Sequence, residues 1–122
     1  MLSGDFFYIT NLDEGNGKIT AMLELNATHK IFDGHFPGQP VVPGVCMLQM
    51  VKEILESVLE KSTRLTGADL LKFLVVIDPT ENNVVHAELK YSLDEGGKII
   101  VGASLFNESV IYFKMNGVFL LV

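Results

Sequence analysis

The 122-residue sequence has one cysteine, no tryptophan and few basic residues. A lone cysteine, Cys46, excludes a disulfide framework and a zinc site built from cysteines. Nine Lys and Arg stand against fifteen Asp and Glu, for a net charge of −6. Nucleic acid is therefore not an expected partner, because phosphate binding requires a basic face. Charged residues make up 20% and hydrophobic residues 48%, a balance that excludes disorder for most of the chain.

Signals for secretion or membrane insertion are also lacking. The first ten residues contain Asp5 and no Lys or Arg, so we expect no secretory signal. The long uncharged run over residues 36–51 contains three of the four prolines, which excludes a membrane-spanning helix there. We expect a single domain over residues 1–122, located in the cytoplasm.

Most of the sequence predicts β-strands. Every second residue from Ile19 to Leu25 is apolar, which is typical of a half-buried strand. The turn-forming residues Asp13–Gly17 precede it, so Phe6–Leu12 and Lys18–Leu25 are predicted to form a hairpin. Further strands are predicted over Leu70–Ile77, Val85–Leu93, Ile99–Phe106 and Val110–Val122. The last three follow one another closely and predict an antiparallel meander.

One long helix is predicted between these groups of strands, from Gly44 to Lys61. Pro43 stands at its start, where a missing N–H costs nothing. The first two turns are apolar on every side except Gln49, which predicts burial all round. The later turns carry Lys and Glu and are predicted to be polar. We therefore expect an α+β architecture, with a long central helix wrapped by a curved antiparallel sheet.

The chemically informative stretch is His35-Phe36-Pro37-Gly38-Gln39-Pro40-Val41-Val42-Pro43-Gly44-Val45. Its prolines fix φ, so the loop is stiff. It places a histidine at one end and a helix N-terminus, with free N–H groups, at the other. A base and an oxyanion site are the parts needed to remove a proton next to a carbonyl. His29 and His86, in contrast, are predicted to be structural or exposed.

This stretch resembles the signature of the β-hydroxyacyl-acyl carrier protein dehydratases of fatty acid synthesis, His-Phe-Pro-Gly-x-Pro-x-x-Pro-Gly-Val. The resemblance implies the hotdog fold, in which a curved sheet wraps a long helix and two chains pair. It implies that His35 is the catalytic base and that the N–H of Gly44 binds the thioester carbonyl. The substrate tunnel is expected to be lined by Phe36, Pro43, Val45 and Met50, although Met50 fits the core equally well.

The sequence departs from this family at the second catalytic group. The family has an acid, Glu or Asp, at the helix position held here by Gln49, and a Gln one turn later, where this chain has Glu53. An amide can donate a hydrogen bond but cannot deliver a proton to a leaving hydroxide. Positions i and i+4 share a helix face, so Glu53 is a candidate alternative acid, or else an ordinary surface residue. Gln49 either assists catalysis or caps a buried polar contact near His35.

The resemblance implies an enzyme that eliminates water from a (3R)-hydroxyacyl thioester on acyl carrier protein, giving a trans-2-enoyl thioester without a metal or organic cofactor. It implies a homodimer or a higher even-numbered oligomer. The alternative is a catalytically impaired hotdog subunit that binds acyl thioesters or forms a heterodimer with an active homologue. A hotdog thioesterase is disfavoured by the Pro-Gly motif. Carrier proteins are acidic, so docking requires a local basic patch, for which Lys61 and Arg64 are candidates.

Overall fold

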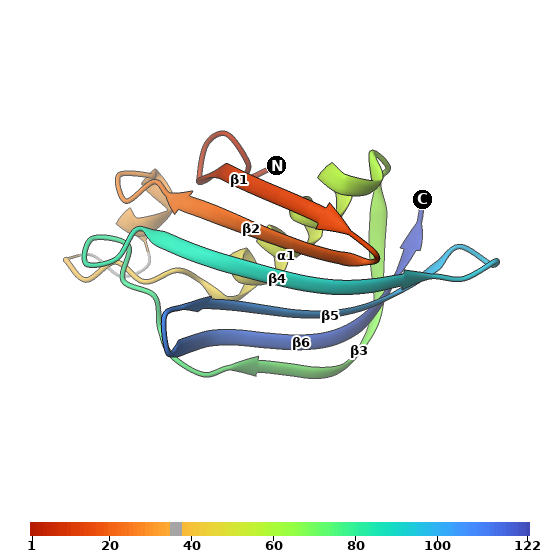
Figure 1. Ribbon diagram of the computed structural model, residues 1–122. Coiled ribbons are helices and arrows are strands. Elements are labelled where there is room, and N and C mark those ends of the chain that lie inside the picture. Colours follow the sequence, from red (N-terminus) through yellow and green to blue (C-terminus); the bar gives the residue numbers. More distant parts are fainter. Residues whose placement is uncertain (35–37) are drawn as a thin grey trace.

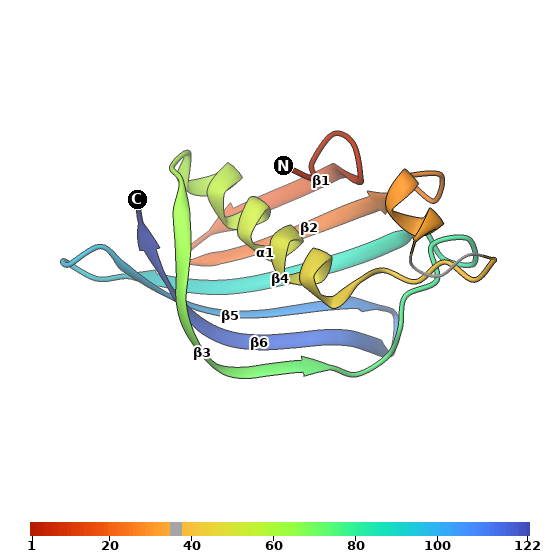
Figure 2. The same cartoon turned by 180° about the vertical axis from the view of Figure 1, so that it is seen from behind.

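The computed structural model of the protein describes residues 1–34 and 38–122. One six-stranded antiparallel sheet, in the order β1-β2-β4-β5-β6-β3, curves around helix α1 (Figures 1 and 2). The elements are β1 (Phe7–Gly15), β2 (Lys18–Leu25), a 3₁₀ turn η1 (Lys30–Asp33), α1 (Gly44–Leu59), β3 (Thr63–Phe73), β4 (Val84–Leu93), β5 (Lys98–Asn107) and β6 (Val110–Leu121). The predicted α+β architecture is confirmed, including the meander β4-β5-β6.

The predicted hairpin is present, but its turn is shorter than expected. Strand β1 continues through Gly15, which pairs with Lys18, so only Asn16 and Gly17 form the turn. Both have positive φ, 54° and 76°, the conformation of a two-residue turn that matches the twist of the strands. An asparagine followed by a glycine adopts it with little strain, so the acidic residues before them remain in the strand.

We expect Gly17→Ala to lower the free energy of unfolding by about 2 kcal/mol, because a side chain at positive φ is strained. An added Cβ would also lie 2.7 Å from the carbonyl oxygen of Tyr91. Gly15→Ala is the matched control, since no atom lies within 4 Å of its added Cβ. Urea unfolding of both variants measures the difference. Equal midpoints would contradict the assigned role of Gly17.

Strand β3 was predicted wrongly as Leu70–Ile77. It begins at Thr63 and ends at Phe73. Two register shifts against β6, at Leu65/Gly67 and at Ala68/Leu70, bend it sharply, so its first part crosses the end of the sheet (Figure 2). β-Bulges interrupt the alternation of side chains. The polar, bulged first half therefore lacks the period that identifies a strand in the sequence.

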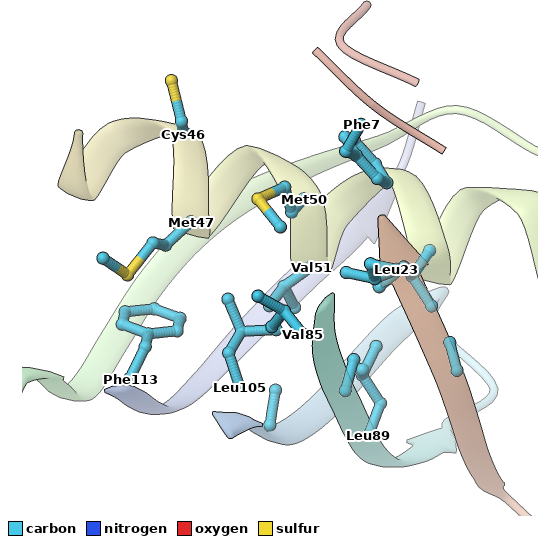
Figure 3. Close-up of a cluster of buried hydrophobic side chains, with 14 of the residues drawn as sticks. Phe7, Leu23, Cys46, Met47, Met50, Val51, Val85, Leu89, Leu105 and Phe113 are labelled. Atoms are coloured by element: carbon cyan, nitrogen blue, oxygen red, sulfur yellow. The ribbon is translucent and has the colours of Figure 1, made fainter. Parts of the chain in front are cut away.

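Helix α1 packs one face on the concave side of the sheet. In Figure 3, Met47, Met50 and Val51 point toward side chains from β2, β4, β5 and β6, whereas Cys46 lies on the opposite side of the helix. The residues of this core that are fully or almost fully buried include Phe7, Leu23, Val85, Leu89, Leu105 and Phe113. Apolar contact with the sheet, rather than helix propensity, thus fixes the helix in place.

Two details of the helix differ from the prediction. It ends at Leu59 rather than Lys61, because Glu60 adopts the left-handed conformation (φ 56°) and its N–H bonds to the carbonyl of Glu56. The first turns are not buried all round, since Val45 is 73% exposed. Within the described chain, no element covers that side of the first turn. Within the same residues, no helix is both long enough and apolar enough to cross a bilayer.

Candidate active site

The N-terminus of α1 presents a backbone donor, the N–H of Gly44, that has no partner among the residues that the structure describes. Pro43, in extended conformation, caps the helix, and its carbonyl accepts the N–H groups of Cys46 (3.0 Å) and Met47 (3.3 Å). Within residues 1–34 and 38–122, no acceptor lies within hydrogen-bond distance of the Gly44 N–H. The free N–H groups and the helix dipole make this end of the helix locally positive. It can therefore stabilise an oxygen that gains negative charge.

This helix end opens onto an apolar groove of about 350 Å³. Its walls are the segments Val41–Gly44 and Phe73–Val76, together with Met47. An added Cβ on Gly44 would lie 2.9 Å from the ring of Phe73, so only glycine lets that ring lie directly against the helix start. An apolar groove that borders the first residue of a helix suits an acyl chain with a carbonyl group.

The loop before α1 is joined by a backbone hydrogen bond to the segment that follows β3. The N–H of Val42 donates to the carbonyl of Ile77 at 3.0 Å. A second cavity of about 450 Å³ is lined by residues from both segments, including Gln39 and Asp78, and by Tyr112 of β6. The loop therefore borders two cavities, one apolar and one with polar groups at its wall.

The sequence-predicted residues occupy different environments. His35 and Phe36 lie outside the described residues. Pro43 is buried beside the groove. Met50 is fully buried and points into the core (Figure 3). Val45 is largely exposed, so in a single chain it lines no enclosed space.

Gln49 and Glu53 form the polar pair of the helix. The amide nitrogen of Gln49 donates to a Glu53 carboxylate oxygen at 2.8 Å, which confirms that the two positions share a face. Glu53 was predicted to be either an acid or a surface residue, and the surface reading is wrong, because Glu53 is only 2% exposed. Its carboxylate also accepts the backbone N–H groups of Leu2 (2.8 Å) and Ser3 (2.7 Å).

Gln49 and the Gly44 N–H do not face the same space within one chain. Helix geometry places Gln49 roughly 140° around the axis from Gly44 and about 7.5 Å along it. In agreement, the apolar groove is lined by Gly44 and Met47 but not by Gln49 or Glu53. Within one chain, Gly44 and Gln49 therefore lie on different sides of the helix.

The remaining titratable candidates have structural environments. His29 caps η1, its Nδ1 accepting the N–H of Ile31, while its Nε2 lies 3.0 Å from Asp5. The His86 ring stacks on Phe106. Burial raises the pKa of the Cys46 thiol, which disfavours its nucleophilic thiolate form. In the part of the chain that the structure describes, no cluster of three or more His, Cys, Asp or Glu could hold a metal ion.

Two features of the site were not predicted. The first is the exposed apolar run Phe73–Val76 along the groove, which was assigned to the interior of a strand. Its sequence signal was the unbroken run of apolar residues without alternation. The second is the pair of backbone donors on Glu53. Backbone N–H groups are the same in every residue, so no sequence signal identifies them.

Comparison with known proteins places these features in a family. Residues 11–100 match the ApeI-like family model, described as ApeI dehydratase. A protein of Lactobacillus helveticus named 3-hydroxyacyl-acyl-carrier-protein dehydratase FabZ is 27% identical over 101 residues, which cover 75% of this chain and 68% of the relative. The Myxococcus xanthus protein of the same name is 33% identical over 61 residues, covering 50% and 40%. The chain spans 39–68% of the length of the first four such relatives.

Solved structures share the fold. A chain of the dehydratase heterocomplex ApeI:P from Xenorhabdus doucetiae has a TM-score of 0.72 at 18% identity, covering 92% of this chain and 96% of that one. Cj0977, a sigma28-regulated virulence protein from Campylobacter jejuni, has a TM-score of 0.68 at 11% identity, covering 92% and 82%. At such low identities the likeness concerns the fold alone.

Proposed function

This chain belongs to the ApeI-like dehydratase family, and we propose that it eliminates water from a (3R)-hydroxyacyl thioester carried on acyl carrier protein, giving a trans-2-enoyl thioester. The observation that carries the proposal is the N–H of Gly44, a residue that lines the apolar groove and whose N–H has no acceptor among residues 1–34 and 38–122. The groove has the chemistry of an acyl site and the N–H that of an oxyanion donor. We place this activity in the cytoplasm, on one domain formed by residues 1–122.

In the proposed reaction His35 removes the α-proton of the thioester. The electrons of that C–H bond move toward the carbonyl, whose oxygen gains negative charge and is stabilised by the N–H of Gly44. The enolate-like intermediate then expels the β-hydroxyl, which leaves as water after gaining a proton. The thioester already acidifies the α-carbon, so these steps require no metal or organic cofactor. Gln49, Glu53 or water assists the leaving group.

The test is turnover by the purified chain. Hydration of a crotonyl thioester runs the reaction backward and is followed by loss of enoyl-thioester absorbance. Dehydration of carrier-bound hydroxyacyl substrates of several lengths then identifies the natural range. Activity on carrier-bound substrates but not on free thioesters would point to docking, for which the exposed Lys61 and Arg64 are the candidates. Absence of both activities would overturn the proposal.

A second candidate function rests on Gln49. A subunit without a carboxylic acid at this position would bind acyl thioesters or pair with an active homologue, while contributing little chemistry itself. A solved chain with this fold, from Xenorhabdus doucetiae, is described as part of a dehydratase heterocomplex, so the fold is compatible with pairing between different subunits. Loss of a general acid typically costs about 10²–10⁴ in rate. Assays with a co-purified homologue separate the two functions, since only this candidate requires the homologue for turnover.

We expect two copies of the chain to pair, as a homodimer or as a unit of a larger even-numbered oligomer. Strand β3 is an edge strand within the described sheet, and the exposed apolar run Phe73–Val76 continues it. Exposed apolar edges bind a second strand readily. Pairing would also supply the groove of one chain with the Gln49 face of the other. Light scattering should therefore give at least twice the chain mass.

Charged substitutions test this edge. Val75→Lys with Val76→Lys should shift the mass toward the monomer, because two buried ammonium groups would oppose pairing. Ile100→Lys, which is also exposed but lies on β5, is the matched control and should leave the mass unchanged. A stable, folded wild-type monomer at micromolar concentration would contradict the prediction.

A further inference from the structure

The Glu53 carboxylate is a buried charge that is held by three hydrogen-bond donors. The N–H of Leu2 and the amide of Gln49 share one oxygen, Oε2, and the N–H of Ser3 bonds the other, Oε1. A buried carboxylate is tolerated only when such donors compensate it. The segment before β1 is held in place in turn, since the Leu2 carbonyl accepts the N–H groups of Asp5 and Phe6. Glu53 therefore joins this segment to the middle of α1.

These contacts fix the orientation of the Gln49 amide. An ionised carboxylate can only accept hydrogen bonds, so the NH₂ group of Gln49 must face Glu53. The carbonyl oxygen of Gln49 then points away from Glu53. Among residues 1–34 and 38–122, no donor lies within hydrogen-bond distance of that oxygen. The half-buried Gln49 thus offers an acceptor, not a donor, to whatever group approaches this face of the helix.

We propose that Glu53 is a positioning residue, which holds Gln49 so that its carbonyl oxygen accepts a hydrogen bond from the β-hydroxyl of the substrate. The inference rests on the proposed dehydratase function. Glu53 would affect the reaction only through its effect on Gln49. Gln49 would orient the hydroxyl through its O–H bond. The proton that converts the leaving hydroxyl into water would come from a solvent water molecule rather than from Gln49 or Glu53. Glu53, with both oxygens occupied by donors, would not touch the substrate.

A double-mutant cycle on kcat separates this role from direct catalysis. Glu53→Gln should lower kcat about tenfold, with KM changed by less than about twofold, because its amide would no longer hold Gln49 in one orientation. Gln49→Met, which removes the amide at similar side-chain length, should lower kcat by a similar factor. In the Gln49→Met background, Glu53→Gln should have no further effect. If the two losses multiply instead, Glu53 acts independently of Gln49 and the proposal is wrong.

The Ser3 backbone donor provides a second route if the Glu53 variant does not fold. Ser3→Pro removes the N–H that holds the carboxylate and leaves both helix residues unchanged. Ser3→Ala keeps that N–H and is the matched control. We expect Ser3→Pro to lower kcat severalfold in the wild-type background and not at all in the Gln49→Met background. Equal activity of Ser3→Pro and Ser3→Ala would contradict the role of the segment.

The side-chain amide signals of Gln49 give a readout that does not depend on turnover. In a ¹⁵N-labelled wild-type protein, the two amide protons should exchange slowly with solvent and should show contacts to the backbone N–H of Leu2. Glu53→Gln should speed that exchange. If no thioester is turned over but Gln49 is protected, the proposed function fails and the positioning stands. If Gln49 exchanges like a free glutamine in wild type, the positioning fails whatever the activity.

Discussion

His35→Asn should yield a folded protein without measurable hydration or dehydration of hydroxyacyl thioesters. Asparagine has no basic nitrogen, and His35 is the group that we assign to remove the α-proton. Loss of a general base typically costs about 10²–10⁴ in rate. Circular dichroism and light scattering should show the wild-type fold and assembly, so that the loss is chemical. Turnover of a crotonyl thioester by both proteins measures the effect.

His86→Asn is the control for this substitution. The His86 ring is half-buried and stacks on Phe106, away from the apolar groove at the start of α1. This variant should retain wild-type turnover and lose at most a little stability. If the His35 variant keeps more than a small fraction of activity, the base is another residue. The motif would then be a structural feature of the loop rather than a catalytic one.

The elements that could be predicted from the sequence are those in which one face is buried along the whole length. In β2, buried and exposed residues alternate without a break. In the first six residues of β4, buried residues alternate in the same way with half-buried ones. Strand β3 lacks this regularity because of its two bulges and because it lies at the edge of the sheet. An edge strand has less neighbouring structure to impose a pattern on its side chains.

The candidate site was predictable in its spacing but not in its environment. The i, i+4 relation placed Gln49 and Glu53 on one helix face, and the 2.8 Å hydrogen bond between them confirms it. The burial of Glu53 depends on the backbone of Leu2 and Ser3, about fifty residues earlier in the chain. The exposure of Val45 arises because no other element of the described chain packs against that side of the first helical turn. Both are tertiary properties that no local pattern contains.

The second large effect on turnover is expected from placing an acid at position 49, where the family has Glu or Asp and this chain has Gln49. Gln49→Glu would add a carboxyl at hydrogen-bond distance from Glu53. Like charges so close disfavour a second ionisation, so the pair would share a proton. That proton would lie between the two carboxyls rather than toward the substrate. We therefore expect Gln49→Glu alone to raise turnover less than Gln49→Glu combined with Glu53→Gln, which removes the neighbouring charge.

Combining Gln49→Glu with Glu53→Gln exchanges the two side chains and restores the acid-then-amide order of the dehydratases that this chain resembles. The double variant has the composition and net charge of the wild type, so any change in activity arises from position alone. The new carboxyl at 49 would accept the amide of residue 53 and would keep its other oxygen for the substrate. We expect turnover to rise at least tenfold, within the usual contribution of a general acid.

The exchange should have a cost in stability and a characteristic pH dependence. The Glu53 oxygen that bonds Gln49 also accepts the N–H of Leu2. An NH₂ group in its place leaves that N–H without an acceptor, and we expect the free energy of unfolding to fall by about 1–3 kcal/mol. A general acid works only when protonated, so the gained activity should decline as the pH rises, and a third substitution, His35→Asn, should remove it. If the exchanged protein is no faster than wild type, position 49 does not reach the leaving hydroxyl, and the chain is better described as a partner subunit whose chemistry is supplied by a homologue.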